Sequence, residues 1–349
     1  MPKVKSPDSQ KRGLEIQHDI DIPETLPPII SASRSTDIPA FYSDWFISRF
    51  NAGFLVWINP INQKPQIVDL KQVKFIIFWT KNADPLIKYL DFFDQKKVKY
   101  YFQYTLNNYD LEGYEPNISP LHDRIKTFKK LSKKIGKEKI IWRFDPLLLS
   151  NKITVGTLIN RISEIGDEIH HFTEKLVVSF IDIEPYKRVR KNLDRSSLTD
   201  IREFEKTEML DFGERISKLN KRWGLTLATC GESVDLSEFG IIHNKCIDPD
   251  LIQRIAANDY SFIKYVKEHS NKDRGQRKNC MCVTSKDIGQ YNTCPHLCRY
   301  CYANYTPNIV KNNYQSFLMK NKCPTIVDGE KWERFSLKIK SQQLSLNDY

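Results

Sequence analysis

Three cysteines near the end of the sequence have the residue type and spacing that point most directly to chemistry. Cys294, Cys298 and Cys301 follow a C-x3-C-x2-C pattern, with Tyr300 directly before the last cysteine. Three thiolates on one short loop can hold three corners of a 4Fe-4S cluster, and the fourth iron is then open to a substrate or cofactor. The loop therefore predicts an iron-sulfur site that takes part in a reaction.

The cysteine loop, residues 294–304, resembles the cluster loop of radical S-adenosylmethionine enzymes and is most like that of the DNA-repair photolyase and spore photoproduct lyase branch. The resemblance implies that the three cysteines ligate the cluster, that S-adenosylmethionine chelates the fourth iron, and that Tyr300 lies near its adenine. It also implies reductive cleavage of S-adenosylmethionine to methionine and a 5'-deoxyadenosyl radical. Such an enzyme needs a separate electron donor.

The position of the loop differs from the superfamily pattern. There the loop follows the first strand of the barrel, near the N-terminus, whereas here fewer than fifty residues follow it. We therefore expect a circularly permuted barrel in which residues 290–293 form the strand that enters the loop. Residues 30–41 and 286–294 also resemble DUF1848, a bacterial family of unknown function with a displaced loop of this kind. That resemblance spans most of the chain and implies no particular reaction.

Four further cysteines lie upstream of the loop: Cys230, Cys246, Cys280 and Cys282. Four thiolates are the number that closes a second 4Fe-4S cluster or a zinc site. Apart from the close Cys280 and Cys282 pair, their spacing is irregular. Buried free thiols are the alternative, because cysteine is often buried as a small apolar residue.

The composition is that of a globular protein with one large domain or a domain and an appendage. The 349 residues are 40% hydrophobic and 12% aromatic, enough to bury a sizeable core. No apolar run approaches the roughly 20 residues that span a bilayer, and residues 1–13 lack the apolar stretch of a signal peptide. We expect a cytoplasmic protein, in which eight cysteines favour metal ligation over disulfides.

The charge balance favours anionic partners. Lys and Arg number 54 against 43 Asp and Glu, for a net charge of +11. Such an excess attracts phosphates and predicts nucleic acid as a partner. Much of it lies in residues 126–139 and 187–195, which are equally well explained as solvated helix faces.

Short apolar runs alternate with amphipathic stretches along the chain, an order typical of β/α units. The runs predict strands over residues 28–33, 54–58, 73–80, 98–106, 139–144, 175–181 and 225–229, and the stretches predict helices over residues 40–51, 85–95, 121–135, 154–170 and 199–223. This order predicts an α/β fold with a partial or complete parallel (β/α) TIM-like barrel, and a doubly wound open sheet is the alternative. Residues 54–70 could instead form a hairpin at the sheet edge.

Four segments follow from this pattern. Residues 1–26 are polar and are expected to form a flexible lead-in, and residues 27–245 to form the barrel-like domain. Residues 246–310 are the cysteine-rich segment expected to close the barrel, and residues 311–349 are expected to be a helical extension.

In parallel α/β folds, ligands bind outside the carboxyl ends of the strands, so polar residues there are candidates for the site. Guanidinium groups could grip a carboxylate or phosphate, and carboxylates could orient an amine or ribose hydroxyls. The predicted catalytic residues are Arg34, Arg143, Asp145 and Glu232, and the predicted cofactor-binding residues are Ser33, Lys81, Asn82 and Tyr300. Loops after strands are polar in any case, and Asp37 is also a natural helix cap.

The leading hypothesis is a radical S-adenosylmethionine-type enzyme with a permuted barrel, acting on nucleic acid or a nucleotide-like substrate. The alternatives are a non-catalytic iron-sulfur or zinc protein that binds nucleic acid, and a two-cluster electron carrier. A fourth thiolate from outside the loop would close the first site to S-adenosylmethionine. The sequence has no phosphate-binding loop, nucleophile elbow or zinc-protease helix motif, so hydrolase and nucleotide-triphosphatase functions lack support.

Overall fold

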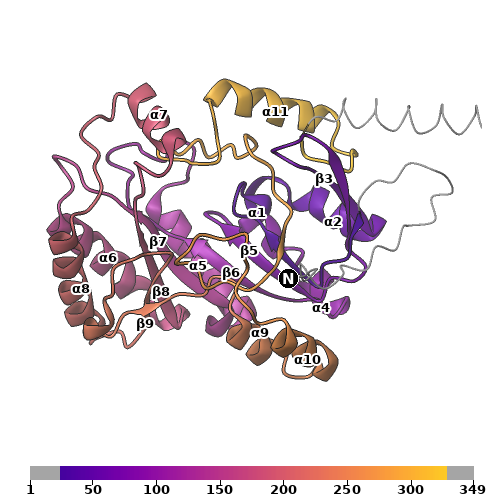
Figure 1. Ribbon diagram of the computed structural model, residues 1–349, viewed down its shortest axis with the longest axis horizontal. Helices are drawn as coiled ribbons and strands as arrows, with labels where there is room; N and C mark the ends of the chain where they lie inside the picture. Colours follow the sequence, from indigo (N-terminus) through magenta and orange to yellow (C-terminus); the bar gives the residue numbers. More distant parts are fainter. Residues whose placement is uncertain (1–23, 328–349) are drawn as a thin grey trace, which may run out of the picture.

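The computed structural model describes residues 24–327, and an eight-stranded sheet is its central element (Figure 1). The strand order is β10-β9-β8-β7-β6-β5-β2-β11, and every neighbouring pair is parallel. The strands are β2 (Ile29–Ala32), β5 (Phe75–Thr80), β6 (Lys99–Thr105), β7 (Ile140–Leu147), β8 (Lys175–Phe180), β9 (Thr226–Thr229), β10 (Ile242–His243) and β11 (Lys286–Asp287). Within residues 24–327, β10 and β11 do not pair with each other, so the sheet is an open, partial TIM-like barrel.

Helices and short 3-10 turns follow most strands, as the alternating sequence pattern predicts. They are α1 (Ile38–Phe41), α2 (Ser43–Ala52), α3 (Asp84–Ile87), α4 (Leu90–Gln95), α5 (Leu121–Ile135), η1 (Lys137–Lys139), α6 (Val155–Ile169), η2 (His170–Phe172), α7 (Lys187–Arg195), α8 (Lys206–Asn220) and η3 (Ser237–Phe239). The predicted helix over residues 121–135 has the bounds of α5. The α/β class and the TIM-like sheet are confirmed.

The two faces of the sheet bury different sets of side chains, because successive residues of a strand point to opposite sides. On β6, Phe102 and Tyr104 join the outer core, which packs against α2, α4, α5, α6 and α8. Tyr101 joins an inner core that is completed by α9 (Pro249–Ile255) and α10 (Tyr260–Glu268). Figure 1 shows α9 and α10 together at the end of the sheet opposite α7. Both faces are therefore covered.

The predicted hairpin over residues 54–70 is present, but it is not at the edge of the main sheet. Strand β3 (Phe54–Ile58) pairs antiparallel with β4 (Pro65–Asp69), which also pairs with β1 (Glu24–Thr25). These strands form a separate three-stranded sheet with its own small core. The predicted lead-in therefore contains a short strand at its end, and residues 1–23 lie outside the described residues.

Two predicted elements have other bounds. Residues 290–293 are not a strand, because Asn292 has a left-handed φ of 61° and the Thr293 hydroxyl closes a turn on the Gln290 carbonyl. The strand before the cysteine loop is β11 instead. The helix predicted from residue 199 begins seven residues later, because Arg202 forms a β-bridge with Leu149.

Helix α11 (Pro307–Met319) follows the cysteine loop, so the boundary predicted at residue 310 falls inside it. Its Tyr314 and Phe317 rings pack edge-on against Tyr42, 5.9 and 4.7 Å between ring centroids. Across residues 24–327, every helix is too short or too polar to cross a bilayer.

Candidate functional site at the strand ends

The cysteine loop is held against the ends of β2, β5 and β6 by contacts from distant parts of the chain. The Tyr42 hydroxyl donates to the Thr293 carbonyl at 2.5 Å, and the Asn192 amide of α7 donates to the Cys301 carbonyl at 2.8 Å. The Arg299 amide donates to the Tyr114 carbonyl at 2.9 Å. The loop is thus fixed by three separate elements, at the edge of the sheet where parallel α/β proteins bind ligands.

The loop sulfurs are enclosed and face hydrogen-bond donors. Backbone amides of His296 and Asp37 serve Cys294, and the Ala303 amide lies 3.3 Å from the Cys301 sulfur. The positive charge of Lys81 acts on the Cys298 sulfur and favours its thiolate form. Burial raises the pKa of all three thiols, so their protons are retained unless a cation displaces them.

Among residues 24–327, no three His, Cys, Asp or Glu side chains surround a point where a single metal ion would sit. A 4Fe-4S cluster does not require such a point, because each thiolate ligates a different iron. In the described part of the chain, the loop sulfurs therefore do not form a site for a lone ion.

Tyr300 and Lys81, both predicted cofactor ligands, meet at a buried carboxylate that the sequence did not single out. Lys81 Nζ lies 2.6 Å from Glu115 Oε1 and 3.3 Å from the Tyr300 hydroxyl, which also donates to Glu115. Burial by itself would raise the pKa of Glu115, but Lys81, Tyr300 and Arg124 outweigh it and lower that pKa. The position of Tyr300 is therefore fixed by the hydrogen bonds of its hydroxyl to Glu115 and Lys81.

Asp37 ties the loop to the first two sheet strands. Its carboxylate accepts hydrogen bonds from the Thr80 hydroxyl and the Lys81 amide, both at 2.7 Å, and lies 2.8 Å from His296 Nε2. It also accepts from the Ala40 amide as the N-cap of α1, which confirms the predicted capping role. His296 therefore positions the loop, and its Nδ1 is buried without a partner.

Arg143 and Asp145 come together on the inner face, because residues two apart on β7 share a side of the strand. Their side chains are 2.5 Å apart, and Arg143 also contacts Gln103 and the Cys246 sulfur, each at 3.2 Å. Asn107 joins this pair to the loop: its amide donates to Glu115 and to the Asp145 carbonyl. One polar network thus links the two groups of cysteines.

Arg34 and Arg143 both lie close to the Trp79 ring. The Arg34 and Arg143 guanidinium carbons are 5.7 and 5.2 Å from the Trp79 ring centroid. Arg34 Nη2 and Trp79 Nε1 are both enclosed without a hydrogen-bond partner. Two enclosed donors beside two positive charges would suit the oxygens of an anionic ligand.

Among the residues that the structure describes, Glu232 forms no hydrogen bond or ion pair with Arg34 or Arg143, and the arginine on which its charge acts is Arg277. It accepts from the Phe180 amide at 3.0 Å and the Ser179 hydroxyl at 3.2 Å, at the ends of β8 and β9. Burial, followed by the Asp182 carboxylate, raises the pKa of Glu232 to about 8. The structure therefore does not pair it with Arg34 or Arg143.

Two predicted cofactor ligands are occupied with local structure. The Ser33 hydroxyl accepts from the Ser35 and Thr36 amides and closes the turn after β2. The Asn82 side chain accepts from the Asp84 amide at 3.1 Å at the start of α3. Both side chains stabilise the loops at the strand ends. In the described part of the chain, neither forms a contact with Tyr300.

The four upstream cysteines also come together, as the sequence predicts, but in a row. Cys230 and Cys246 sulfurs are 3.2 Å apart, Cys282 is within hydrogen-bonding reach of Cys246, and Cys280 is within reach of Cys282. The bond from Cys282 lowers the pKa of Cys280 to about 7 despite partial burial. Among the described residues they form no three-ligand site for a metal ion.

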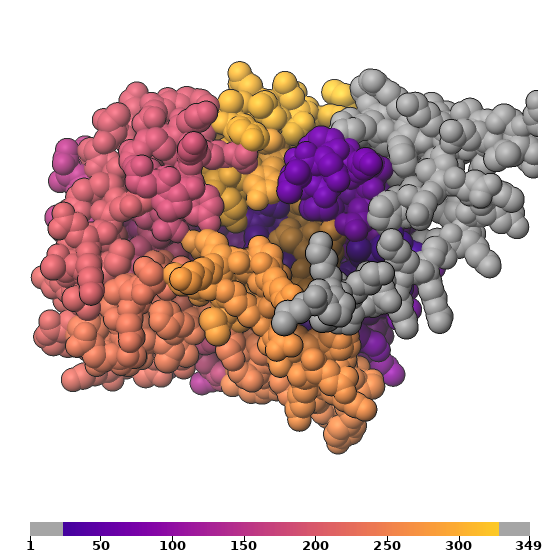
Figure 2. Space-filling view, in the orientation of Figure 1, coloured from indigo at the N-terminus to yellow at the C-terminus, as the bar shows by residue number. Residues whose placement is uncertain are grey.

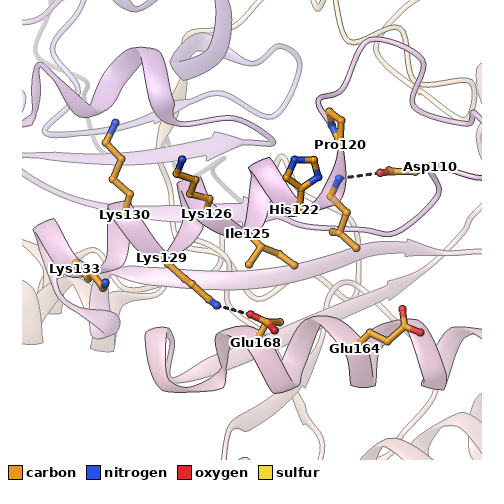
Figure 3. Close-up of a pocket in the computed structure, with 11 residues that line it drawn as sticks. Asp110, Pro120, His122, Ile125, Lys126, Lys129, Lys130, Lys133, Glu164 and Glu168 are labelled. Atoms are coloured by element: carbon orange, nitrogen blue, oxygen red, sulfur yellow. Dashed lines mark hydrogen bonds and ion pairs between the residues drawn. The ribbon is translucent and has the colours of Figure 1, made fainter.

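The two basic segments differ in their surroundings. The α5 lysines line an open groove of about 1260 Å³ against α6, with Lys129 reaching Glu168 (Figure 3). Lys130 and Lys134 are also ion-paired, to Asp84 and Asp91, as expected of a solvated helix face. In α7, by contrast, Arg188 donates to the Tyr302 carbonyl and lies 3.5 Å from the Tyr305 ring centroid.

The comparisons with known proteins give a family match and distant structural matches. A family model described as "Domain of unknown function (DUF1848)" matches residues 29–303, which include both groups of cysteines. A search of curated proteins found no match. A crystal structure of a "putative alpha-L-fucosidase" from Bacteroides thetaiotaomicron VPI-5482 is 12% identical and covers 72% of this chain and 99% of its own, with a TM-score of 0.26.

Proposed function

Because this chain belongs to the DUF1848 family, whose function is unknown, we propose its activity from its own residues: it is an iron-sulfur enzyme of the radical S-adenosylmethionine type. Cys294, Cys298 and Cys301 would hold a 4Fe-4S cluster with one open iron. A bound, reduced cluster would supply one-electron cleavage of S-adenosylmethionine.

The observation that carries this proposal is the place of β11 in the sheet. β11 pairs with β2, so the order across the sheet runs β11-β2-β5-β6-β7-β8-β9-β10. Read in that order, the strand that precedes the cysteine loop is the first of the series, although it is last in the sequence. A loop after the first strand is the arrangement of the radical enzymes that the loop resembles, so the order supports a circular permutation of the same plan.

The donor set of the loop also supports a cluster. Backbone amides face the Cys294 and Cys301 sulfurs, and Lys81 lies near Cys298. N–H groups and a lysine stabilise the negative charge of cluster thiolates. Asn192 and Tyr42 fix the loop backbone, so the sulfurs are positioned by packed residues.

The chain's other residues would bind and orient the cofactor. Tyr300 is held by Glu115 and Lys81, which fixes the position of its ring within the loop. Arg34, with an enclosed donor that lacks a partner, is placed to receive a carboxylate or phosphate oxygen.

We further propose a nucleic acid or nucleotide-like substrate. Figure 2 shows a hollow in this face between α7, α11 and the β3–β4 hairpin. Tyr302 and Tyr305, beside Arg188 of α7, are 42% and 51% exposed. Exposed aromatic rings interleaved with arginine are suited to stacking on bases and contacting phosphates.

The test is anaerobic reconstitution with iron and sulfide, reduction with dithionite in the presence of S-adenosylmethionine, and chromatography for 5'-deoxyadenosine. We expect 5'-deoxyadenosine from the wild type and from Cys323→Ser, whose thiol lies outside both cysteine groups, and none from Cys298→Ala. A fully loaded, reducible cluster that yields no 5'-deoxyadenosine would overturn the enzyme and favour an electron carrier. Zinc in place of iron would favour the non-catalytic alternative.

A further inference from the structure

The upstream cysteines form a continuous row of thiols through the inner core. Cys230 and Cys246 are in direct contact at 3.2 Å, and Cys282 and Cys280 continue the row by hydrogen bonds from sulfur to sulfur. All four are free thiols. A tetrahedral zinc ion needs four sulfurs around one centre, and residues 24–327 offer no such group. A second 4Fe-4S cluster, in which each thiolate ligates a different iron, stays a prediction.

The row crosses the open side of the partial barrel. Cys230 directly follows β9 and Cys246 follows β10, at one edge of the sheet. Cys280 and Cys282 belong to the segment that leads to β11, at the other edge. Cys246 and Cys282 are each 2% exposed, whereas Cys280 is half-buried beside the exposed Met281. Cys230, like Cys280, is half-buried, so the two most buried thiols lie in the middle of the row. The hydrogen bond from Cys282 lowers the pKa of Cys280 to about 7, which favours entry of a disulfide at that end.

Two hydrogen-bond donors face the Cys246 sulfur, although its hydrogen bond with Cys282 and its burial leave the pKa of this thiol raised overall. Arg143 Nη1 and Asn244 Nδ2 both donate to the Cys246 sulfur, at 3.2 and 3.1 Å. A guanidinium beside a sulfur stabilises the charged form, which is the nucleophile in thiol–disulfide exchange. The neighbouring sulfur, Cys230, is the one that such a nucleophile would meet first.

We propose that Cys230 and Cys246 are a redox-active dithiol, and that Cys280 and Cys282 relay exchange between this pair and an organic disulfide in solution. The inference concerns chemistry outside the cysteine loop and does not depend on the proposed radical activity. Transient redox use is also the form in which disulfides occur in reducing compartments.

The exchange balances as follows. The Cys280 thiolate attacks a disulfide RSSR and releases one RS⁻, and Cys282 then attacks the Cys280 sulfur and releases the second. Cys246 then attacks the Cys282 sulfur, which forms a Cys246–Cys282 disulfide and releases the Cys280 thiol. Cys230 finally attacks the Cys246 sulfur, which forms the Cys230–Cys246 disulfide and releases the Cys282 thiol. In sum, two protein thiols and RSSR give the Cys230–Cys246 disulfide and two RSH, with two electrons passed to the organic disulfide.

The first test maps the disulfide in the wild-type full chain. The protein is reduced, freed of reductant without oxygen, equilibrated in buffers of oxidised and reduced glutathione, quenched in acid, alkylated and digested for mass spectrometry. We expect a peptide pair joining Cys230 to Cys246, two hydrogens lighter than the separate peptides, which dithiothreitol reverses. Absence of this pair even in oxidised glutathione alone would overturn the proposal.

The second test follows the rate of oxidation. Cys280→Ser should slow formation of the Cys230–Cys246 disulfide by about tenfold or more but leave its equilibrium extent unchanged, because only the relay is lost. Cys323→Ser is the matched control and should change neither. An unchanged rate of disulfide formation in Cys280→Ser would contradict the proposed relay. Metal content is measured in parallel: stoichiometric zinc or iron that Cys246→Ser loses and Cys298→Ser retains would overturn the dithiol and restore a metal site.

Discussion

Lys81 and Glu115 form an ion pair of 2.6 Å that is enclosed between the strand ends and the cysteine loop. The Glu115 side chain is 2% exposed, and it also faces Tyr300 and Arg124. A buried pair of this kind contributes little net stability relative to apolar residues, but it makes the loss of one partner costly. It therefore fixes the position of Tyr300 through a contact that tolerates little change.

Removal of the Glu115 carboxylate should destabilise the protein strongly. Glu115→Ala leaves Lys81 buried without its counter-charge, whereas Arg124 keeps its ion pair with Asp110, and we expect the free energy of unfolding to fall by about 3–5 kcal/mol in urea titrations. The exposed pair of Glu214 and Lys218 is the control, and Glu214→Ala should cost less than about 0.5 kcal/mol. Equal costs for the two variants would contradict the enclosed pair.

The same pair predicts a pH profile. The pKa of Glu115 is lowered from 4.5, so its contribution is present above pH 4.5 and is lost as the pH falls through the lowered value. The pKa of Lys81 is raised from 10.5, so its contribution is present below pH 10.5 and is lost above it. The difference in free energy of unfolding between the wild type and a Lys81→Met/Glu115→Leu variant should be constant between these limits. Outside them, the wild type should lose stability relative to the variant. Unfolding titrations across pH 3–11 measure it.

Gly166 of α6 leaves no room for a side chain. A Cβ at this position would lie 2.2 Å from Cζ2 of Trp223, whose ring also packs near Trp142. Gly166→Ala should therefore lower the free energy of unfolding by about 1–3 kcal/mol and alter tryptophan fluorescence. Gly156, in the first turn of the same helix, meets only ordinary contacts, and Gly156→Ala should raise stability by up to about 1 kcal/mol. Stabilisation by both substitutions would show that Trp223 gives way freely.

Lys286 should make the protein more stable as the pH rises. Burial lowers its pKa from 10.5 to about 8, with Asp287 opposing the shift. Between these values the unfolded chain binds more protons than the folded one, so the free energy of unfolding increases with pH. Lys286→Met should remove this increase and raise stability at pH 7 by about 1–2 kcal/mol, a discounted value because the side chain is partly solvated.

The control for this profile is Lys264→Met, which replaces a side chain that is 79% exposed and should leave the pH dependence unchanged. Lys286 also lies 3.5 Å from the Trp57 ring centroid and donates to Gln66, and both contacts favour its charged form. Parallel pH profiles for the wild type and Lys286→Met would mean that these contacts cancel the cost of burial.

Arg188 should control local opening of the cysteine loop. Arg188→Ala removes hydrogen bonds to the Tyr302 and Ala303 carbonyls and the contact with the Tyr305 ring. We expect hydrogen exchange in residues 301–305 to become at least about tenfold faster, corresponding to roughly 1.4 kcal/mol of local stability. Arg190 pairs with the exposed Glu184, so Arg190→Ala should leave exchange in the loop unchanged. Equal exchange in both variants would contradict the role of Arg188.

The sequence predicts those parts of this protein that depend on local pattern. Alternating strands and helices follow from hydrophobic periodicity, and Arg143 and Asp145 come together because both lie on one side of β7. The presence of four upstream cysteines also predicts that they come together. Their arrangement as a row is not, since it depends on how β10 and residues 280–282 pack against the inner face.

Other features depend on contacts between distant residues. Glu115 lies in the long loop between β6 and α5, where no periodic pattern marks a charge that will be buried; the unusual length of that loop is the one signal. Strands β10 and β11 have two residues each, too few to show alternation. Ser33 and Asn82 lie at the carboxyl ends of the strands, as predicted. Their side chains, however, are hydrogen-bonded within the turns that they stabilise.

The pairing of β11 with β2 has a consequence for biosynthesis. A chain leaves the ribosome from its N-terminus, so β2 and β5 to β10 are made before the strand that completes their edge. The three loop thiols emerge after the surface that receives them, including Asp37, Lys81 and Glu115, has been synthesised. Folding of that surface can therefore precede docking of the loop, and in the iron-sulfur enzyme that we propose the cluster would be loaded after the surface has formed.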